Sequence, residues 1–395
     1  MGSIIDLGMA PSRRGTIFKE GGIEKLSVDY VPERLPHRES ELGAIVEAFR
    51  PFLEHPHAWR KVLIHGPTGT GKTVTAKKAG EILSKISKGM GVEFKYAHIN
   101  CRFERSAFGL VQEIIRQTVP GLPLRGYGPT EYLRALFGHL EDNDEILLLT
   151  LDEVDYLLAG IGDDILYALT RASETAEIPQ RVSMILITRD TGFLGGLRPQ
   201  VLSKIRPDEA LGFKPYGRSE IFDILSDRVE WAFTAGSVSA EAIGFISKNS
   251  SLLGGGDARY AIQLLLTAGL VADREGSKRI LPEHIREAQE KIDPRIGHED
   301  LLALSDEEKL ALLAIARALR TMEEAVYAPL ETVRDYYGMV YEERGIVPAE
   351  APPLEGILGR LETLGLVDIE EGVGVSLLLM RARALEEFLE TVSLT

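Results

Sequence analysis

The stretch GPTGTGKT matches the pattern G-x-x-x-x-G-K-[ST] and consists of Gly66, Pro67, Thr68, Gly69, Thr70, Gly71, Lys72 and Thr73. It follows an apolar run that predicts a strand at residues 61–65 (KVLIH), and it precedes a predicted helix at residues 74–83, which opens with Val74. The glycines let successive backbone N–H groups turn toward phosphate oxygens, and the positive helix end adds to the attraction. Lys72 supplies a mobile positive charge and Thr73 a hydroxyl for Mg²⁺. We therefore expect residues 66–74 to bind ATP or ADP.

A second segment, which contains two acidic residues, completes this predicted site. The apolar run at residues 146–151 (ILLLTL) is followed directly by Asp152 and Glu153. In α/β sheets, ligands bind at the carboxyl ends of the strands, where these two carboxylates would lie. We expect Asp152 to hold the Mg²⁺ shell and Glu153 to orient or polarise the attacking water. Lys72 would assist phosphoryl transfer by facing the β- and γ-phosphates.

The spacing of apolar runs predicts the fold around this site. Runs at residues 61–65, 92–99, 146–151 and 182–188 alternate with helical stretches, which indicates an α/β domain with a parallel sheet. After about residue 215 the strand signal ends. Helical spacing replaces it, shown by Ala261, Leu264, Leu265 and Ala268. We expect a flexible N-terminal extension at 1–28, the α/β domain at 29–214 and a small helical domain at 215–293.

A third domain is predicted at residues 299–395. Ser305 and Glu308 have the spacing of a capping box and would start a helix at 306–320. Further helices are expected at 330–341 and 354–364. The apolar runs 366–369 and 373–380 flank Glu370, Glu371 and Gly372, which is typical of a hairpin. Three helices followed by a hairpin predict a winged helix.

Composition restricts the class of protein. The 395 residues are 44% hydrophobic and 27% charged, with a net charge of −15 and one cysteine, Cys101. The apolar runs are too short to span a bilayer, so we expect no membrane contact and a cytoplasmic, nucleoid-associated location. Cys101 is expected to be a small buried residue. Residues 300–395 hold 8 Lys and Arg against 19 Asp and Glu, a net of −11, which leaves −4 for the rest.

Four sequence blocks resemble one known family. They are VPERLPHRESEL at 31–42, HINCR at 98–102, LDEVDYL at 151–157 and GDARYAIQLLLTAG at 256–269. Together they are similar to the archaeal origin-recognition and replication-licensing initiators, the Orc/Cdc family of AAA+ ATPases. The resemblance implies an AAA+ domain, a helical lid and a C-terminal winged helix. It also implies three kinds of partner: double-stranded origin DNA, paralogous initiators and a replicative helicase.

The resemblance assigns further residues to the nucleotide. It implies that Val31, His37 and Arg38 lie beside the adenine, and we add Tyr216 to this set. His37 and Arg38 could instead cap the helix that follows them. Arg259 would be the sensor that reaches from the lid to the γ-phosphate and takes part in catalysis; the alternative is an ordinary charge on a helix surface.

Two departures from the family pattern bear on hydrolysis. Thr188 or Arg189 stands where the family usually has a polar sensor, and Gln200 stands at the position of the arginine that acts on a neighbour's ATP. The nearby basic residues Arg198, Lys204 and Arg206 are candidate substitutes for that arginine. The sequence therefore predicts a slow Mg²⁺-dependent ATPase that acts as a conformational switch.

The family implies that DNA is held by the winged helix and by an insertion in the ATPase domain, near residues 120–129. Arg125 and Gly126 are the candidates in the insertion, whose composition is also that of an ordinary surface loop. Arg360 and Arg381 are the candidates in the winged helix. The acids at the expected wing tip carry the wrong sign for phosphates. Tyrosines at 327, 336, 337 and 341 are expected to fill the core rather than to stack on bases.

The function predicted from these features is an ATP-dependent replication initiator that binds origin DNA and helps to recruit or load the helicase. One alternative is an AAA+ DNA motor of the branch-migration type, which also ends in a winged helix. The other is a divergent initiator paralogue that acts mainly through protein partners, as the acidic C-terminal quarter would favour.

Overall fold

The computed structural model describes residues 17–55, 58–104, 106–121, 126, 128–176, 180–205, 208–292, 298–347, 351–378 and 380–391. These residues form two compact units. The sheet unit contains Asp29–Glu220 and Gly256–Ala258. The helical unit contains Ile221–Gly255, Arg259–Thr395 and the described part of Met1–Val28.

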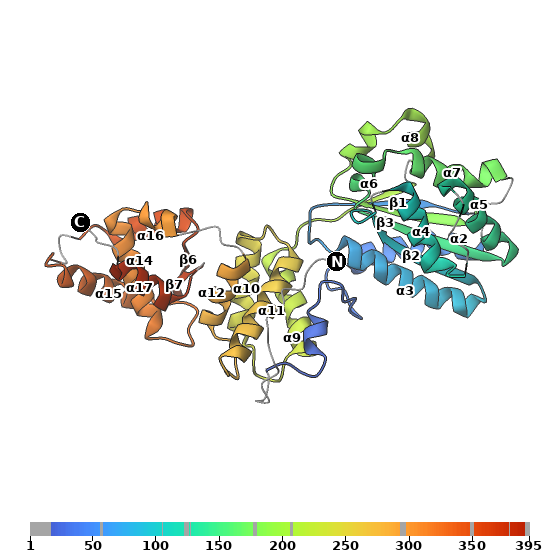
Figure 1. Ribbon diagram of the computed structural model, residues 1–395. Helices are drawn as coiled ribbons and strands as arrows, with labels where there is room; N and C mark the ends of the chain where they lie inside the picture. Colours follow the sequence, from blue (N-terminus) through green and yellow to red (C-terminus); the bar gives the residue numbers. More distant parts are fainter. Residues whose placement is uncertain are drawn as a thin grey trace. The chain divides into compact units, whose positions relative to one another are not determined.

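The sheet unit is built on a parallel sheet (Figure 1), and its strand order is β2-β3-β4-β1-β5. The strands are β1 (Lys61–His65), β2 (Glu93–Asn100), β3 (Glu145–Asp152), β4 (Val182–Thr188) and β5 (Glu209–Gly212). The four predicted strands are confirmed. The sequence analysis missed β5, because its four residues EALG are mostly exposed and form no apolar run.

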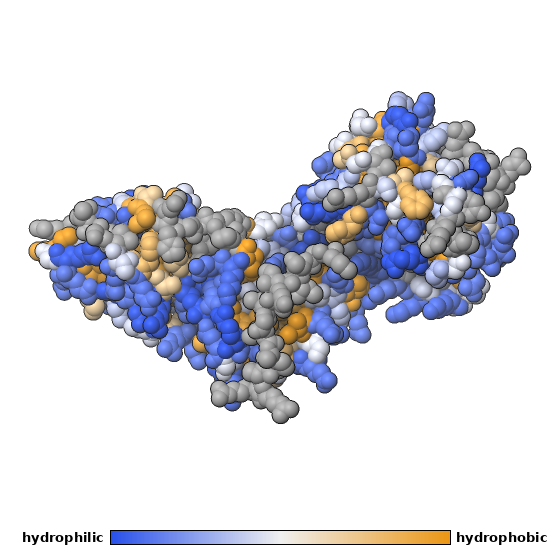
Figure 2. Space-filling view, viewed as in Figure 1, coloured by the Kyte–Doolittle hydropathy of each residue, from blue (hydrophilic) through white to orange (hydrophobic). Residues whose placement is uncertain are grey.

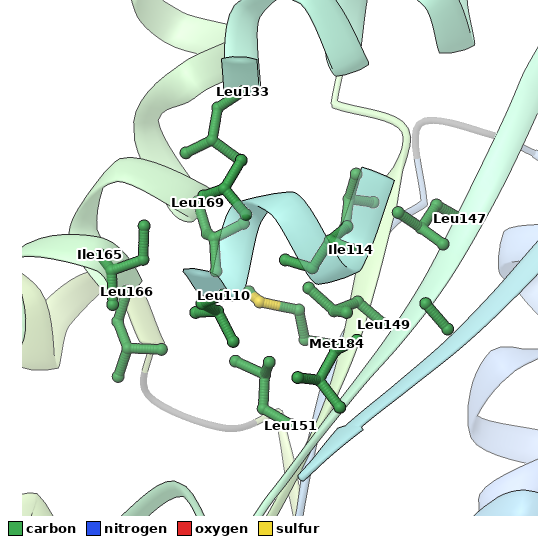
Figure 3. Close-up of a cluster of buried hydrophobic side chains, with 14 of the residues drawn as sticks. Leu110, Ile114, Leu133, Leu147, Leu149, Leu151, Ile165, Leu166, Leu169 and Met184 are labelled. Carbon is green, nitrogen blue, oxygen red and sulfur yellow. The ribbon is translucent and has the colours of Figure 1, made fainter. Parts of the chain in front are cut away.

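Helices cover both faces of this sheet. They are α2 (Glu39–Glu54), α3 (Lys72–Met90), α4 (Ala107–Thr118), α5 (Pro129–Asp142), α6 (Val154–Ile161), α7 (Asp164–Ala176) and α8 (Pro199–Ile205), with a 3₁₀ helix at Gly192–Gly196. Leu147, Leu149 and Leu151 of β3 pack with α4, α5 and α7 (Figure 3). Ile146 and Leu148 point to the other face and pack with α2 and α3. A strand buried on both faces must be apolar at every position, which explains the unbroken run in β3.

The helical unit begins with a four-helix lid. Its helices are α9 (Arg218–Ala232), which starts in the sheet unit, α10 (Ala240–Leu252), α11 (Ala258–Arg274) and α12 (Pro282–Ile292). The predicted stripe of Ala261, Leu264, Leu265 and Ala268 is fully buried on α11. Helical periodicity therefore identified the core-facing side of this helix correctly.

The expected flexibility of the N-terminal extension is wrong for residues 17–28. Ile17 and Phe18 are buried, and Phe18 pairs with Phe233 both as a β-bridge and through its ring, with centroids 4.7 Å apart. A short helix, α1 (Gly22–Lys25), follows. The segment is ordered by contacts with a lid residue more than 200 positions away, which local composition does not reveal. The rest of the extension, residues 1–16, lies outside the described residues.

The predicted winged helix is confirmed. It contains α13 (His298–Leu302), α14 (Asp306–Arg320), α15 (Leu330–Glu343), α16 (Leu354–Thr363), the hairpin β6 (Val367–Glu370) and β7 (Gly374–Leu377), and α17 (Ala382–Thr391). The capping box of Ser305 and Glu308 starts α14 as expected. Tyr337 and Tyr341 are buried in the core of this domain, and Tyr336 packs against it. Sequence analysis missed α13 and α17.

A fully buried arginine joins the lid to the winged helix. Arg286 of α12 donates to the carbonyl oxygens of Leu377 and Val326 and to the hydroxyl of Ser376, all in the winged helix. Its remaining nitrogen pairs with Glu283 at 2.5 Å, and burial lowers the pKa of Arg286 from its ordinary value. Buried charges are tolerated only when fully hydrogen-bonded, so these contacts specify how the two domains pack.

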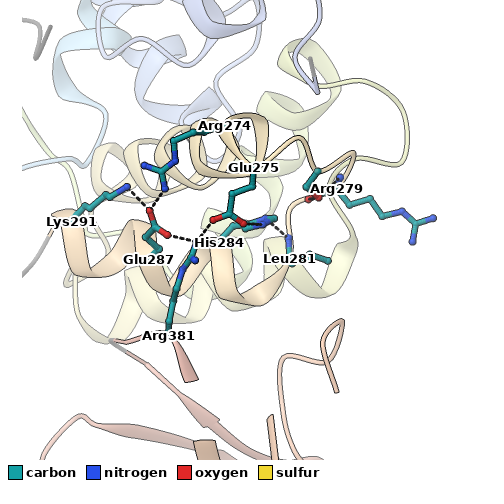
Figure 4. A network of polar contacts seen from close by, with 9 residues as sticks. Arg274, Glu275, Arg279, Leu281, His284, Glu287, Lys291 and Arg381 are labelled. Atoms are coloured by element: carbon teal, nitrogen blue, oxygen red, sulfur yellow. Dashed lines mark hydrogen bonds and ion pairs between the residues drawn. The ribbon is translucent and has the colours of Figure 1, made fainter. Parts of the chain in front are cut away.

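A second set of ionic contacts lies at the same junction (Figure 4). Arg381 of the winged helix pairs with Glu275 and Glu287 of the lid. Glu275 also contacts His284, and Glu287 also contacts Arg274 and Lys291. The lid and the winged helix therefore share one polar network.

None of the described helices has the length and apolar character that a membrane crossing requires. Hydrophilic residues cover most of the face shown in Figure 2, with apolar residues scattered among them.

We expect Arg286→Ala to lower the free energy of unfolding of the helical unit by about 3–5 kcal/mol, because it leaves buried carbonyls and Glu283 without their partner. Urea titration followed by circular dichroism measures the change. Arg383→Ala is the matched control, since this exposed arginine pairs with Glu387 one turn away, and its loss should cost at most about 1 kcal/mol. Equal midpoints for the two variants would contradict the role of Arg286.

Candidate nucleotide site

The loop between β1 and α3 has a backbone that requires glycine. Gly66 and Gly71 have φ values of 148° and 89°. A Cβ on Gly66 would lie 2.2 Å from the carbonyl oxygen of Phe213, and one on Gly71 would lie 2.5 Å from the hydroxyl of Tyr216. These positions admit no side chain, so the loop keeps the open backbone cradle that phosphate binding needs. The glycine pattern predicted this geometry.

Lys72 is the first residue of α3, and its ammonium lies 2.6 Å from the carbonyl oxygens of both Gly66 and Pro67. The positive charge of Lys72 therefore lies against the start of the loop that would surround the phosphates. Thr70 is buried, Pro67 and Thr68 are exposed, and Val74 is half-buried in the first turn of α3. The predicted loop residues are therefore all brought together in one turn and one helix start.

Thr73 and Asp152 meet at the edge of the sheet. The Thr73 hydroxyl donates to Oδ2 of Asp152 at 2.6 Å, and the backbone N–H of Glu153 donates to Oδ1 at 2.9 Å. Burial alone would raise the pKa of Asp152, but contacts from His98, Thr73 and that N–H lower it below its usual range. The carboxylate therefore stays ionised, as a ligand for a cation must.

These oxygens fit Mg²⁺, which prefers hydroxyl and carboxylate ligands together with phosphate and water. Among the described residues, no cluster of three or more His, Cys, Asp or Glu could hold a metal ion. The ion would thus depend on the nucleotide's phosphates as well as on Thr73 and Asp152. When bound, it would neutralise charge that develops on the phosphoryl group.

Glu153 has an uncommon backbone conformation for a side-chain-bearing residue. Its φ is 55° and its ψ is 45°, and it forms the N-cap of α6. Such left-handed residues cost about 1–3 kcal/mol and occur where the surrounding structure holds them for a function. Glu153 is half-buried and follows Asp152, the predicted Mg²⁺ ligand. Its placement is suited to orienting a water molecule at the phosphates.

Arg38 connects the loop to the segment that follows β5. Its guanidinium donates to the carbonyl oxygens of Thr70 and Lys214 and lies 3.9 Å from the ring centroid of Tyr216. Arg38 is also the N-cap residue of α2, although its side chain makes no capping hydrogen bond there. Burial raises the pKa of Tyr216 to about 12, so its hydroxyl remains protonated.

His37 and Val31 lie in the segment before α2. His37 has a φ of 63°, and its Nδ1 is 3.8 Å from Glu220. Val31 is half-buried. The adenine contacts implied for both residues stay predictions.

Comparison with known proteins identifies the family. The model for an AAA domain matches residues 60–193, and the model for a Cdc6 AAA+ ATPase-type lid domain matches residues 222–290. The ORC1-type DNA replication protein 2 of Sulfurisphaera tokodaii is 32% identical over 359 residues, which cover 89% of this chain and 85% of the relative. This chain belongs to the ORC1-type DNA replication proteins. Its AAA+ domain, lid and winged helix are those of the family.

Solved structures agree with this assignment. The crystal structure of Cdc6p from Pyrobaculum aerophilum matches with a TM-score of 0.82 at 28% identity, covering 95% of this chain and 98% of the other. The structure of the Aeropyrum pernix ORC1 protein in complex with DNA matches with a TM-score of 0.61 at 30% identity, covering 93% and 96%.

The residues at the expected departures from the family pattern are buried, paired or exposed as follows in this ORC1-type chain. Thr188 is buried and donates to the carbonyl oxygen of Asp190. Arg189 is exposed, and its guanidinium donates to the hydroxyl of Tyr156. Gln200 is exposed on α8. Arg198 pairs with Asp163 and Asp164.

Lys204, the second candidate substitute for the arginine that acts on a neighbour's ATP, belongs to α8. Arg206, the third, lies outside the described residues.

The remaining predicted residues lie elsewhere in the chain. Arg259 is the second residue of α11, in the helical unit, and its sensor role stays a prediction. Arg125 lies outside the described residues, while Gly126 has a φ of 93°. Arg360 pairs with Glu308 at 3.1 Å. Arg381 joins the winged helix to the lid, so the structure gives it a packing role that the sequence analysis did not anticipate.

Sequence analysis also missed contacts that support the site. His98 of β2 contacts both Asp152 and Tyr96, and Asp257 lies against Gly69. Alternation along β2 places His98 and Tyr96 on one face, but nothing in the sequence shows what that face meets. Cys101 is buried as expected, and burial raises the pKa of its thiol.

We expect Lys72→Ala to abolish ATP binding, because the loop loses its point charge and charge-assisted hydrogen bonds of about 1.5–3 kcal/mol each. Isothermal titration with ATP and Mg²⁺ measures the affinity. Lys78→Ala, further along α3 and paired with Glu81, is the control that should bind normally. Unchanged affinity in Lys72→Ala would mean that the phosphates bind elsewhere.

Glu153→Gln should slow ATP hydrolysis by about a hundredfold while nucleotide affinity changes little, since it removes water activation and spares the Mg²⁺ ligand. Phosphate release and ADP affinity are measured on the same preparation. A large loss of affinity would instead show that Glu153 supports the fold of the site.

Proposed function

We propose that this chain is an ATP-dependent replication initiator that binds origin double-stranded DNA and helps to recruit or load the replicative helicase, with its nucleotide acting as a conformational switch. Paralogous initiators would be its partners at the origin. The observation that carries the proposal is the nucleotide site at residues 66–73 and 152–153 in a chain that matches a DNA-bound ORC1 structure over 93% of its length.

The contacts at the nucleotide site fit a switch that hydrolyses ATP slowly better than an enzyme that hydrolyses ATP rapidly. The loop at residues 66–73 (the P-loop), with Asp152 and Glu153, would supply the groups that bind Mg²⁺ and nucleotide. At the end of β4, however, the Thr188 hydroxyl is engaged by Asp190 and the Arg189 guanidinium by Tyr156. In-line phosphoryl transfer depends on positioning, so a site without a free polar sensor there should turn over slowly. Arg259 would report the γ-phosphate to the lid.

The charge pattern favours the ATPase domain as the main DNA contact. Seven of the eight Lys and Arg residues between 300 and 395 lie within 4 Å of a carboxylate: Lys309, Arg317, Arg320, Arg334, Arg360, Arg381 and Arg383. Only Arg344 has no carboxylate partner among the described residues. Phosphate binding requires cations that are available, and the winged helix offers few. Arg125 and Gly126 of the insertion are therefore our preferred DNA contacts.

We predict that Arg125→Ala weakens duplex binding by the full-length protein more than Arg360→Ala does. Arg360 already interacts with Glu307 and Glu308, so its loss changes the net attraction for phosphates little. Fluorescence anisotropy with an origin duplex at two salt concentrations measures affinity and its salt dependence. A lost phosphate contact should reduce the salt slope by about one.

Greater damage from Arg360→Ala would show that the winged helix holds DNA despite its acidity. If the protein does not bind the duplex even at low salt, the alternative of a divergent initiator paralogue that acts mainly through protein partners is favoured. Fast ATP turnover by a hexameric ring would favour the DNA motor.

A further inference from the structure

We infer that His98 is a positioning residue for the nucleotide's magnesium ion, acting through Asp152. Its Nε2 lies 3.3 Å from Oδ2 of Asp152, and both side chains are shielded from solvent, with 12% and 3% of their surfaces exposed. His98 belongs to the sequence block HINCR, but the sequence analysis assigned it no function. The inference rests on the proposed nucleotide site and adds a residue to it.

Asp152 has two side-chain partners on the same oxygen. One is Thr73, which the P-loop pattern assigns to the Mg²⁺ shell, and the other is His98. The Thr73 hydroxyl can donate its proton to Oδ2 while a lone pair faces the cation. His98 would be the second side chain that keeps Oδ2 in place, while the Glu153 N–H holds Oδ1. Outer partners of this kind orient metal-binding carboxylates in proteins.

The second ring nitrogen of His98, Nδ1, also has a polar neighbour. Nδ1 faces the hydroxyl of Tyr96 at 3.5 Å, and that hydroxyl lies 3.2 Å from both Thr150 Oγ1 and the carbonyl oxygen of Ala76. The Tyr96 hydroxyl donates to Ala76 and accepts from Thr150, so it offers no further proton to Nδ1. Nε2 faces the ionised carboxylate of Asp152 and is the nitrogen suited to donate to it. The imidazole therefore has a polar neighbour at each nitrogen.

Strand β2 contacts both elements that carry the proposed Mg²⁺ ligands, α3 and β3. Tyr96 packs so closely on α3 that a Cβ on Gly80 would lie 2.6 Å from its ring, and its hydroxyl reaches Ala76, three residues after Thr73. His98, two residues further along β2, reaches Asp152 of β3. Since α3 carries Thr73 and β3 carries Asp152, His98 and Tyr96 fix the separation of the two ligands.

The test measures the gain in ADP affinity that Mg²⁺ provides, as the ratio of affinities with Mg²⁺ and with EDTA. His98→Phe fills the space without a donor and should reduce this gain by about tenfold or more, with the affinity in EDTA unchanged. His98→Gln can place an amide N–H near the position of Nε2 and should restore most of the gain. Circular dichroism confirms that each variant is folded.

His139→Ala is the matched control. His139 contacts Glu145 at 3.5 Å, a second histidine–carboxylate pair on β3 but at the opposite end of the strand. It should keep the full Mg²⁺ gain. A full gain in His98→Phe, or a loss in His98→Gln as large as in His98→Phe, would overturn the inference and leave His98 as a packing residue. No Mg²⁺ gain in the unmodified protein would overturn the proposed nucleotide site itself.

Discussion

The hydrogen bond between Thr73 and Asp152 depends on the register of three parallel strands. β1 carries the P-loop and β3 carries Asp152, and both pair with β4 between them. A slip of one residue in either pairing would turn each side chain of that strand to the other face and move Asp152 away from Thr73. The buried rows on both faces of β3 prevent such a slip, because each row packs against its own set of helices. The packing of the core thus determines the geometry of the nucleotide site.

The helical unit depends in a similar way on polar contacts at one junction. Arg286 meets winged-helix carbonyls from within the lid, and Lys248 of the lid pairs with Asp368 at 2.7 Å and with Glu370. One of these acids, Glu370, is an acid that the sequence analysis placed at the expected wing tip. The acidity of the C-terminal quarter is thus partly explained by pairing inside the protein: its carboxylates bind arginines and lysines that would otherwise be available to phosphates.

Local patterns predicted those parts of the molecule that are determined locally. The P-loop, the four long strands, the stripe on α11 and the capping box at Ser305 all follow from spacing within about ten residues. β5 and α17 were missed because one is short and exposed and the other follows the last recognised motif. The burial of Phe18, the role of Arg381 and the contact of His98 with Asp152 each join residues more than 50 positions apart. Hydrophobic periodicity in the sequence does not predict such long-range pairs, which are seen only in the folded structure.

In the proposed function, nucleotide and DNA bind to different parts of this chain, and the bound nucleotide controls the affinity for DNA. The most direct test measures the affinity of the full-length protein for an origin duplex in three states: nucleotide-free, with Mg²⁺ and ADP, and with Mg²⁺ and a non-hydrolysable ATP analogue. The account predicts that the ADP and ATP-analogue states differ in duplex affinity by at least about fivefold, the lower end of typical coupling between two sites. Equal duplex affinity in all three states, with nucleotide binding verified in the same samples, would contradict it.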